Sequence, residues 1–151
     1  MIHLLKSLKN GEATVALISI KPQFALKLFS GDKQYEFRRR KVREDLKWAL
    51  VYASAPIKKI IGILKISEVK SSSPTLAWNT AKNMAGISRR DFRIYFKGCK
   101  IAWAIRIEKA INFTKPLCLS EIDPLMRAPQ SLVYVNNAFL NSLLHKSLPY
   151  D

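Results

Sequence analysis

The sequence predicts an α+β protein with five to six strands of mixed length and helices at their flanks. Three observations support this class: runs of β-branched and aliphatic residues, a helical pattern after the first run, and a pair of capped helices in the middle. A chain of 151 residues is long enough for one well-packed domain and too short for two of ordinary size. We therefore expect a single core.

The first strand and the first helix are predicted at the start of the domain. Residues 14–20 are rich in β-branched and aliphatic side chains, which favours a strand. Pro22 suits the first turn of a helix because no amide hydrogen is needed there, and Gly31 is placed to end that helix. The apolar face of the helix consists of Phe24, Ala25, Leu28 and Phe29.

Two further strands are predicted at residues 48–53 and 57–69, after a loop at 44–47 and on either side of a turn at 54–56. Apolar residues on both faces of the second strand imply that it is buried on both sides. Gly62 in this strand indicates a bulge or a close approach of another backbone.

A pair of helices is predicted next. Ser73 is a suitable N-cap with Pro74 at the first helical position, and this helix runs to about Met84. Ser88, with Asp91 three residues later, resembles a capping box that starts a second short helix closed by Gly98.

The last third contains one strong pattern and one weaker one. Strict alternation at residues 101–108 predicts a strand with an apolar face, and a loop-rich stretch with three prolines follows it. An apolar stripe at residues 139–144 predicts a final helix, which either packs on the domain or pairs with another copy of the chain. The sequence does not decide between these, so the oligomeric state stays open. We divide the chain into an N-terminal arm (1–13), one domain (14–135) and a C-terminal helix with its tail (136–151).

Charge indicates the class of partner. The chain has 26 Lys and Arg against 11 Asp and Glu, a net charge of +15, and such a field attracts polyanions, of which nucleic acid is the obvious one. The alternative is that the basic residues only keep the protein soluble. Five of them fall within positions 38–43, where they repel one another unless a partner compensates, and this favours a nucleic-acid partner, RNA or DNA.

Several classes are disfavoured. The sequence has no apolar run near the length of a membrane span and no apolar region typical of a signal peptide, so we expect a cytoplasmic protein without a membrane partner. Cys99 and Cys118 cannot form a disulfide framework and have no metal-ligand spacing, and His3 and His145 lie at opposite ends of the chain. We therefore predict no metal site and no cofactor.

Residues 31–38 concentrate the chemistry. If they form a glycine turn that leads into a strand, Glu36 and Arg38 lie on the same face, roughly 6.6 Å apart along the strand. The direction of Lys33, at the turn, is not fixed by this argument. A carboxylate that accepts hydrogen bonds beside cations that donate them can hold a nucleobase edge or a phosphate, or act as general acid and base. The alternative is a surface ion pair without function.

This octapeptide resembles the G-x-K-x-x-E-x-R signature of the ASCH domains, a branch of the PUA-like superfamily, with Gly31, Lys33, Glu36 and Arg38 at its fixed positions. The resemblance extends over about residues 14–135. Further similar segments, in the same order, are Val51–Pro56, Tyr95–Gly98 and Pro129–Ser131. The resemblance implies a PUA-like β-barrel of five to six mixed strands with flanking helices and a ligand cleft beside the barrel mouth.

The resemblance also implies a function. ASCH domains are expected to bind RNA, some cut RNA, and some hydrolyse the acetyl amide of acetylated cytidine. Those amidohydrolases have a threonine nucleophile at the position of Glu36 and a carboxylate in the middle helical region, whereas residues 80–90 here contain no acidic residue. We therefore expect binding of RNA or a modified nucleotide in RNA metabolism or regulation. If the chain is an enzyme, we expect a ribonuclease or another nucleoside-directed hydrolase with Lys33 and Glu36 as catalytic residues. A third alternative is a transcription-related adaptor that acts through its C-terminal helix.

The predicted contacts have different roles. Lys33, Glu36 and Arg38 would contact the base or ribose, and the arginines at 39, 40 and 43 would contact phosphates. Aromatic residues would stack on bases unless they belong to the core. The candidate nucleic-acid-binding residues are Lys21, Lys33, Glu36, Arg38, Arg39, Arg40, Arg43, Tyr52, Ser54, Trp78 and Gln130.

Overall fold

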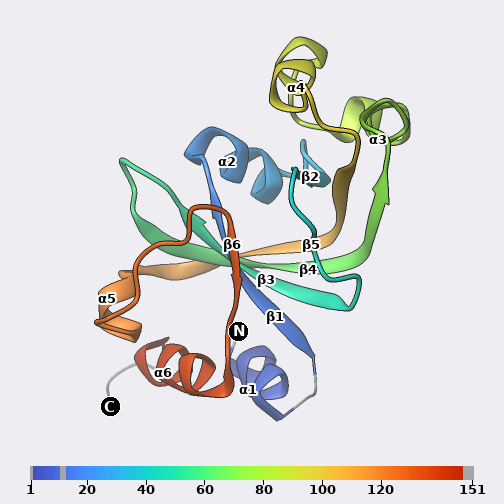
Figure 1. Ribbon diagram of the computed structural model, residues 1–151. Coiled ribbons are helices and arrows are strands. Elements are labelled where there is room, and N and C mark those ends of the chain that lie inside the picture. The colour runs from blue at the N-terminus through green and yellow to red at the C-terminus, as the bar shows by residue number, and fades with distance from the viewer. Residues whose placement is uncertain (1, 11–12, 148–151) are drawn as a thin grey trace.

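The computed structural model describes residues 2–10 and 13–147. Six strands form one mixed sheet in the order β2-β5-β4-β3-β1-β6, and this sheet curls into a half-barrel (Figure 1). The strands are β1 (Thr14–Ile20), β2 (Tyr35–Arg38), β3 (Leu46–Ala53), β4 (Lys59–Ser72), β5 (Ala102–Leu117) and β6 (Leu132–Tyr134). Only β1 and β3 pair in parallel among the described strands, and the other pairs are antiparallel. The predicted α+β class with five to six mixed strands is confirmed.

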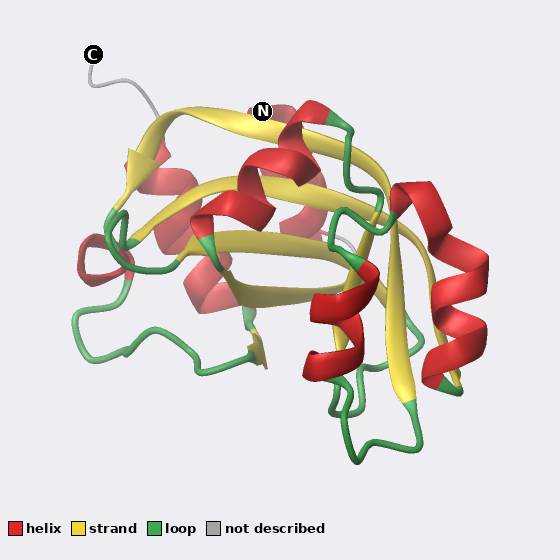
Figure 2. Ribbon diagram, turned by 90° about the horizontal axis from the view of Figure 1, so that it is seen from above, coloured by secondary structure: helices red, strands yellow, loops and turns green. Residues whose placement is uncertain are grey.

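Helices cover both faces of the sheet. They are α1 (Ile2–Asn10), α2 (Pro22–Ser30), α3 (Pro74–Ala81), α4 (Arg89–Tyr95), α5 (Leu119–Ile122) and α6 (Asn137–Ser147), with a short 3-10 helix, η1, at Lys82–Met84. In Figure 1, α1, α5 and α6 lie on one side of the sheet and α2, α3 and α4 on the other. Figure 2, seen from above, shows that α2 runs across the strands while α3 and α4 stand at one end of the sheet.

Alternating side chains of the strands pack in two separate apolar clusters, one on each face of the sheet. In β1, Val15 and Leu17 pack with the cluster that contains Leu143 of α6, whereas Ala16 and Ile18 pack on the α2 side. The cause is the strand period of two, which sends neighbouring side chains to opposite faces. Both faces of the central strands are therefore buried, as the apolar runs of the sequence predict.

The terminal segments pack on the domain where they are described. Within the predicted arm, residues 2–10 form α1, whose Leu8 is buried against the same cluster as α6. The final helix of the prediction is α6, and its apolar residues pack on the chain's own core. Residues 1, 11, 12 and 148–151 of the predicted arm and tail lie outside the described residues. No helix within the described ranges is both long and apolar enough to cross a membrane.

Local signals in the sequence place the helices correctly. Gly31 ends α2 with a φ of 87° and donates its backbone N–H to Leu28 O. The Ser73 and Ser88 hydroxyl oxygens accept the backbone N–H of Leu76 and Asp91, at 3.2 and 3.0 Å, and so cap α3 and α4. These three predictions are confirmed.

Gly62 marks a close approach of two elements on the sheet. A Cβ there would lie 2.5 Å from the carbonyl oxygen of Ile111 and 2.5 Å from Cζ of Phe29, closer than a side chain tolerates. The β4–β5 register also shifts between Ile60 and Gly62. The predicted bulge or close approach is confirmed, and it lets α2 sit directly on the sheet.

The element boundaries differ from the prediction mainly in the last third of the chain. The strand predicted at 101–108 continues to Leu117, because β5 pairs with β4 through several register shifts that hide the period-two pattern. Strand β6 and helix α5 have only three and four residues, too few for a periodic signal, and were predicted as loop. Strand β3 begins at Leu46, inside the predicted 44–47 loop, because parallel pairing with β1 extends it. Strand β4 is offset, at 59–72 instead of 57–69.

Candidate functional site

A cavity of about 750 Å³ opens beside β2, the strand that carries the signature residues. Its walls come from the end of β1, the start of α2, β2 with the residues after it, α4 and its following turn, and the segment before β6. It is lined by Ser19, Ile20, Lys21, Phe24, Lys33, Glu36, Phe37, Arg38, Arg39, Arg40, Ser54, Ile87, Phe92, Tyr95, Cys99, Gln130 and Ser131. Segments that are far apart in the sequence therefore meet at this cavity.

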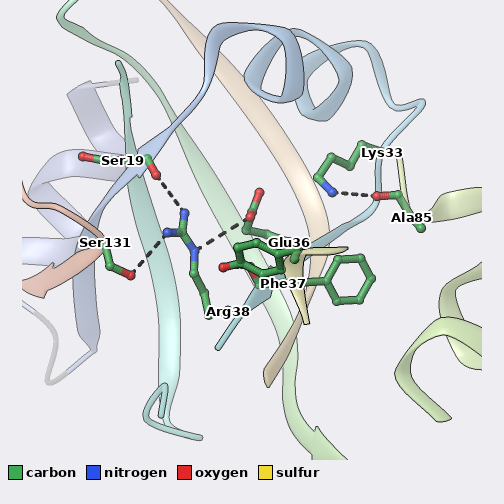
Figure 3. Close-up of polar contacts among 8 residues, drawn as sticks. Ser19, Lys33, Glu36, Phe37, Arg38, Ala85 and Ser131 are labelled. Carbon is green, nitrogen blue, oxygen red and sulfur yellow. Dashed lines mark hydrogen bonds and ion pairs between the residues drawn. The ribbon is translucent and has the colours of Figure 1, made fainter. Parts of the chain in front are cut away.

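Arg38 joins the two edges of the sheet across this cavity. Its Nη2 donates to the carbonyl oxygen of Ser19 at 2.8 Å, and its Nη1 donates to Oγ of Ser131 at 3.3 Å (Figure 3). Arg38 belongs to β2 at one edge of the sheet, whereas Ser19 is in β1 and Ser131 directly precedes β6 at the other edge. These two hydrogen bonds hold the guanidinium in one orientation and connect the two edges of the half-barrel.

Glu36 and Arg38 point to the same side of β2, as strand alternation predicts. Glu36 Oε1 lies 3.8 Å from Arg38 Nε, and the two side chains are only 12% and 11% exposed. Within the described residues, Glu36 Oε2 and Arg38 Nε are buried and have no hydrogen-bond partner. One buried acceptor and one buried donor, on two side chains that contact each other, thus have unused hydrogen-bonding capacity, which is unfavourable unless a bound group satisfies it.

Lys33 turns into the protein from the turn after α2. Its Nζ donates to the carbonyl oxygen of Ala85 at 2.6 Å and lies over the rings of Phe24 and Phe37, 5.5 and 5.2 Å from their centres (Figure 3). The side chain is only 3% exposed. Burial lowers the pKa of Lys33 below its ordinary 10.5, and the negative charge of Glu36 opposes that shift. Lys33 therefore gives up its proton more easily than a surface lysine does.

The rim of the cavity is basic and one wall is aromatic. Lys21, Arg39 and Arg40 are exposed at the rim, and the Arg39 guanidinium lies 4.8 Å from the centre of the Tyr95 ring. Tyr95 in turn donates its hydroxyl hydrogen to the carbonyl oxygen of Phe37 at 3.4 Å. Exposed cations around an aromatic wall can bind phosphates and a base at the same time.

The structure brings most of the predicted site residues together and leaves three outside. Those that line the cavity are Lys21, Lys33, Glu36, Arg38, Arg39, Arg40, Ser54 and Gln130. Arg43 is exposed and pairs with Asp45, with Nη2 2.7 Å from Oδ2. Tyr52 is buried in the apolar cluster on the α6 side, and Trp78 lines a different cavity.

Nine of the lining residues are absent from the predicted set, and three of these, Ser19, Tyr95 and Ser131, make polar contacts at the cavity. Ser131 and Tyr95 lie in segments of the sequence that resemble the ASCH family, so that signal could have identified them. Ser19 bonds Arg38 through its backbone carbonyl, and its hydroxyl donates to Pro129 O at 2.6 Å. No residue pattern indicates such a contact, because it depends on the curvature of the sheet.

Metal ligands are not gathered here. Among the described residues, no group of three or more His, Cys, Asp or Glu side chains is placed to hold a metal ion. The chemistry of the cavity is that of a carboxylate, two buried cations, hydroxyls and aromatic rings.

The chain is similar to known proteins in both sequence and structure. No family model matches it. It is 31% identical over 126 residues to a Zymomonas mobilis protein described as an ASCH domain-containing ribonuclease, and the match covers 80% of this chain and 83% of that protein. The crystal structure of ASCH from Zymomonas mobilis matches with a TM-score of 0.81 at 27% identity, over 89% of this chain and 96% of that one. The N-terminal domain of Staphylothermus marinus McrB matches in fold alone, with a TM-score of 0.56 at 13% identity, over 87% of this chain and 93% of that one.

Proposed function

The chain belongs to the ASCH domain family with its PUA-like half-barrel fold, and we propose that it binds RNA or a modified nucleotide by holding one unstacked nucleotide in the cavity beside β2. The observation that carries this proposal is the pair of buried atoms, Glu36 Oε2 and Arg38 Nε, that have no hydrogen-bond partner in the described chain. A carboxylate accepts N–H groups of a base edge, and a guanidinium N–H donates to a base oxygen or nitrogen. Both side chains line the cavity, so a bound base would satisfy these buried atoms once the side chains turn to expose them.

The surroundings of this pair fit the rest of a nucleotide. Tyr95 and Phe24 offer aromatic faces for stacking, and the exposed Lys21, Arg39 and Arg40 are placed to meet phosphates at the rim. The net charge of +15 raises the rate at which a polyanion finds the cavity. The ribonuclease name of the Zymomonas relative supports RNA as the polyanion.

The test is direct binding of a fluorescently labelled single-stranded RNA, followed by anisotropy over a series of salt concentrations. Glu36→Gln keeps the shape of the side chain and removes the charge, so we expect affinity to fall about tenfold to a hundredfold, as for a lost hydrogen bond to a charged group. The matched control is Glu68→Gln, which changes an exposed carboxylate of β4. Equal affinities for wild type and Glu36→Gln, with both proteins folded by circular dichroism, would refute the proposal.

Cleavage of RNA is the second candidate, favoured by the ribonuclease relative and by the lowered pKa of Lys33. In this mechanism the ribose 2′-oxygen attacks the adjacent phosphorus and the 5′-oxygen leaves. One of Lys33 and Glu36 would accept the 2′-hydroxyl proton, and the other would donate a proton to the leaving 5′-oxygen. Labelled RNA should shorten on a denaturing gel with wild type and stay intact with Glu36→Gln purified in the same way. Intact RNA with the wild type, or equal cleavage by both proteins, would eliminate this candidate.

A further inference from the structure

A second cavity, of about 730 Å³, lies next to the first. Its lining comes from α2, the turn after α2, α3, η1 and the start of α4. It is lined by Lys27, Asp32, Trp78, Asn79, Lys82, Asn83, Gly86, Ile87, Ser88 and Arg89. Ile87 lines both cavities, so they adjoin at this residue.

The segment 84–87 between the cavities is held from the α2 side. Lys33, which lines the first cavity, donates from Nζ to Ala85 O at 2.6 Å, and Lys27, which lines the second, donates from Nζ to Gly86 O at 3.3 Å. The backbone N–H of Gln34 donates to Met84 O at 2.8 Å. Gly86 has a φ of 65°, and a Cβ at this residue would collide with the Lys33 side chain. Hydrogen bonds from α2 and from the residues after it thus hold the backbone of this segment in place.

The second cavity has the chemical composition of a single-strand binding surface. Trp78 is half-buried and its ring centre lies 5.2 Å from that of Phe92, which lines the first cavity. Lys82 and Arg89 are exposed cations at its edge, and Asp32 is the one carboxylate of its lining, with Oδ2 bonded to the Ser30 hydroxyl at 3.0 Å. Nucleic-acid single strands bind where an aromatic platform is combined with cations that follow the backbone.

We propose that the second cavity is a subsite for a neighbouring nucleotide of the same RNA strand, with its base on Trp78 and its phosphates on Lys82 and Arg89. The inference rests on the proposed function, because the first nucleotide must occupy the cavity beside β2. It makes the ligand a single-stranded RNA that spans both cavities, rather than an isolated nucleoside. It also gives a role to Trp78, which lies outside the first cavity.

The experiment compares two double variants that each remove two exposed positive charges. Lys82→Ala with Arg89→Ala changes the second cavity, whereas Arg93→Ala with Lys97→Ala changes nearby residues that line neither cavity. The probe is a labelled single-stranded RNA hexamer. We expect the first double variant to weaken hexamer binding and to lower the slope of log affinity against log salt by about 1.4, or about 0.7 for each lost phosphate contact. The control variant should keep the wild-type slope.

A third variant addresses stacking. Trp78→Leu keeps an apolar residue against Phe92, and we expect it to weaken hexamer binding about 5- to 150-fold, as for one lost base stack. Thermal melting by circular dichroism establishes that each variant is folded at the temperature of the assay. Should Trp78→Leu not fold, the two charge variants decide the question.

The outcomes separate this inference from the function on which it rests. If hexamer binding is sensitive to Glu36→Gln while both double variants weaken it equally or not at all, the subsite is refuted and the proposed function stands. If the wild type does not bind the hexamer, or binds it with no dependence on Glu36, the proposed function fails and the subsite fails with it. A larger effect of the Lys82 and Arg89 substitutions than of the control supports the subsite.

Discussion

Apolar clusters pack both faces of the sheet, but the two faces differ in the charge they bury. The face under α1, α5 and α6 is packed by an apolar cluster whose members include Leu17, Leu50 and Leu143. The two buried charged side chains of the described residues, Lys33 and Arg38, both lie at the cavity on the other side. Burying charge is unfavourable, so a protein keeps it where binding or chemistry requires it. We therefore expect substitutions under α1, α5 and α6 to change stability, and substitutions at the cavity to change RNA binding.

The largest expected effect is on the apolar face. Leu143 is 0% exposed, and Leu143→Ala should lower the free energy of unfolding by about 2–5 kcal/mol through lost apolar contacts and the space left behind. Urea denaturation measures this loss, and Leu125→Ala, at a leucine that is 94% exposed, is the control with little expected change. The RNA affinity of the folded variant should equal that of wild type. A variant that is stable but binds RNA poorly would break the proposed separation of the two faces.

The effect of intermediate size is a pH dependence of stability that comes from Lys33 at the cavity. Because burial lowers the pKa of Lys33, the unfolded chain holds more protons than the folded one between that lowered pKa and 10.5. The stability of wild type should therefore rise with pH through this window relative to Lys33→Met, as the unfavourable burial of the charge is relieved.

Urea unfolding at neutral pH and again near pH 10, for both proteins, measures this difference. Lys47→Met, at an exposed lysine of β3, corrects for the loss of one surface charge. The prediction is contradicted if the stability of wild type relative to Lys33→Met stays constant, or falls, as the pH rises.

The smallest effect is expected from substitution of Arg43, which lines neither cavity. Arg43 is exposed and paired with Asp45, so Arg43→Ala should change the melting temperature little, because solvent screens such pairs. Its effect on the salt dependence of RNA binding should also be small. Arg40, at the cavity rim, provides the comparison, and Arg40→Ala should lower the salt slope by about 0.7. Equal slopes for the two variants would show that binding does not discriminate the cavity from the surrounding basic surface.

Local chemistry made much of the fold predictable. Gly31 needs a positive φ, Ser73 and Ser88 satisfy helix N-termini, and strand alternation places Glu36 beside Arg38 on one face. Each of these features depends on residues within a few positions of one another. They were correct for that reason.

What could not be predicted depends on the curvature of the sheet and on long-range pairing. The sequence gives no direction for Lys33, because its contacts are with Ala85 and with ring faces that the fold brings to it. Tyr52 looked available for stacking, but the face to which it points is decided by pairing of β3 with β1. Trp78 is half-buried and lines a cavity that no local pattern shows.

The contact of Arg38 with Ser131, 93 positions later, sets the order in which the protein can acquire its site. During synthesis the signature segment leaves the ribosome early, but β2 has no sheet partner until residues 103–106 of β5 follow, and the guanidinium has no hydroxyl until Ser131 does. A nascent or truncated chain that stops before residue 131 thus carries the signature without one hydrogen-bond partner of Arg38. The hydrogen bonds that orient Arg38 are therefore complete only when the last part of the domain has been made.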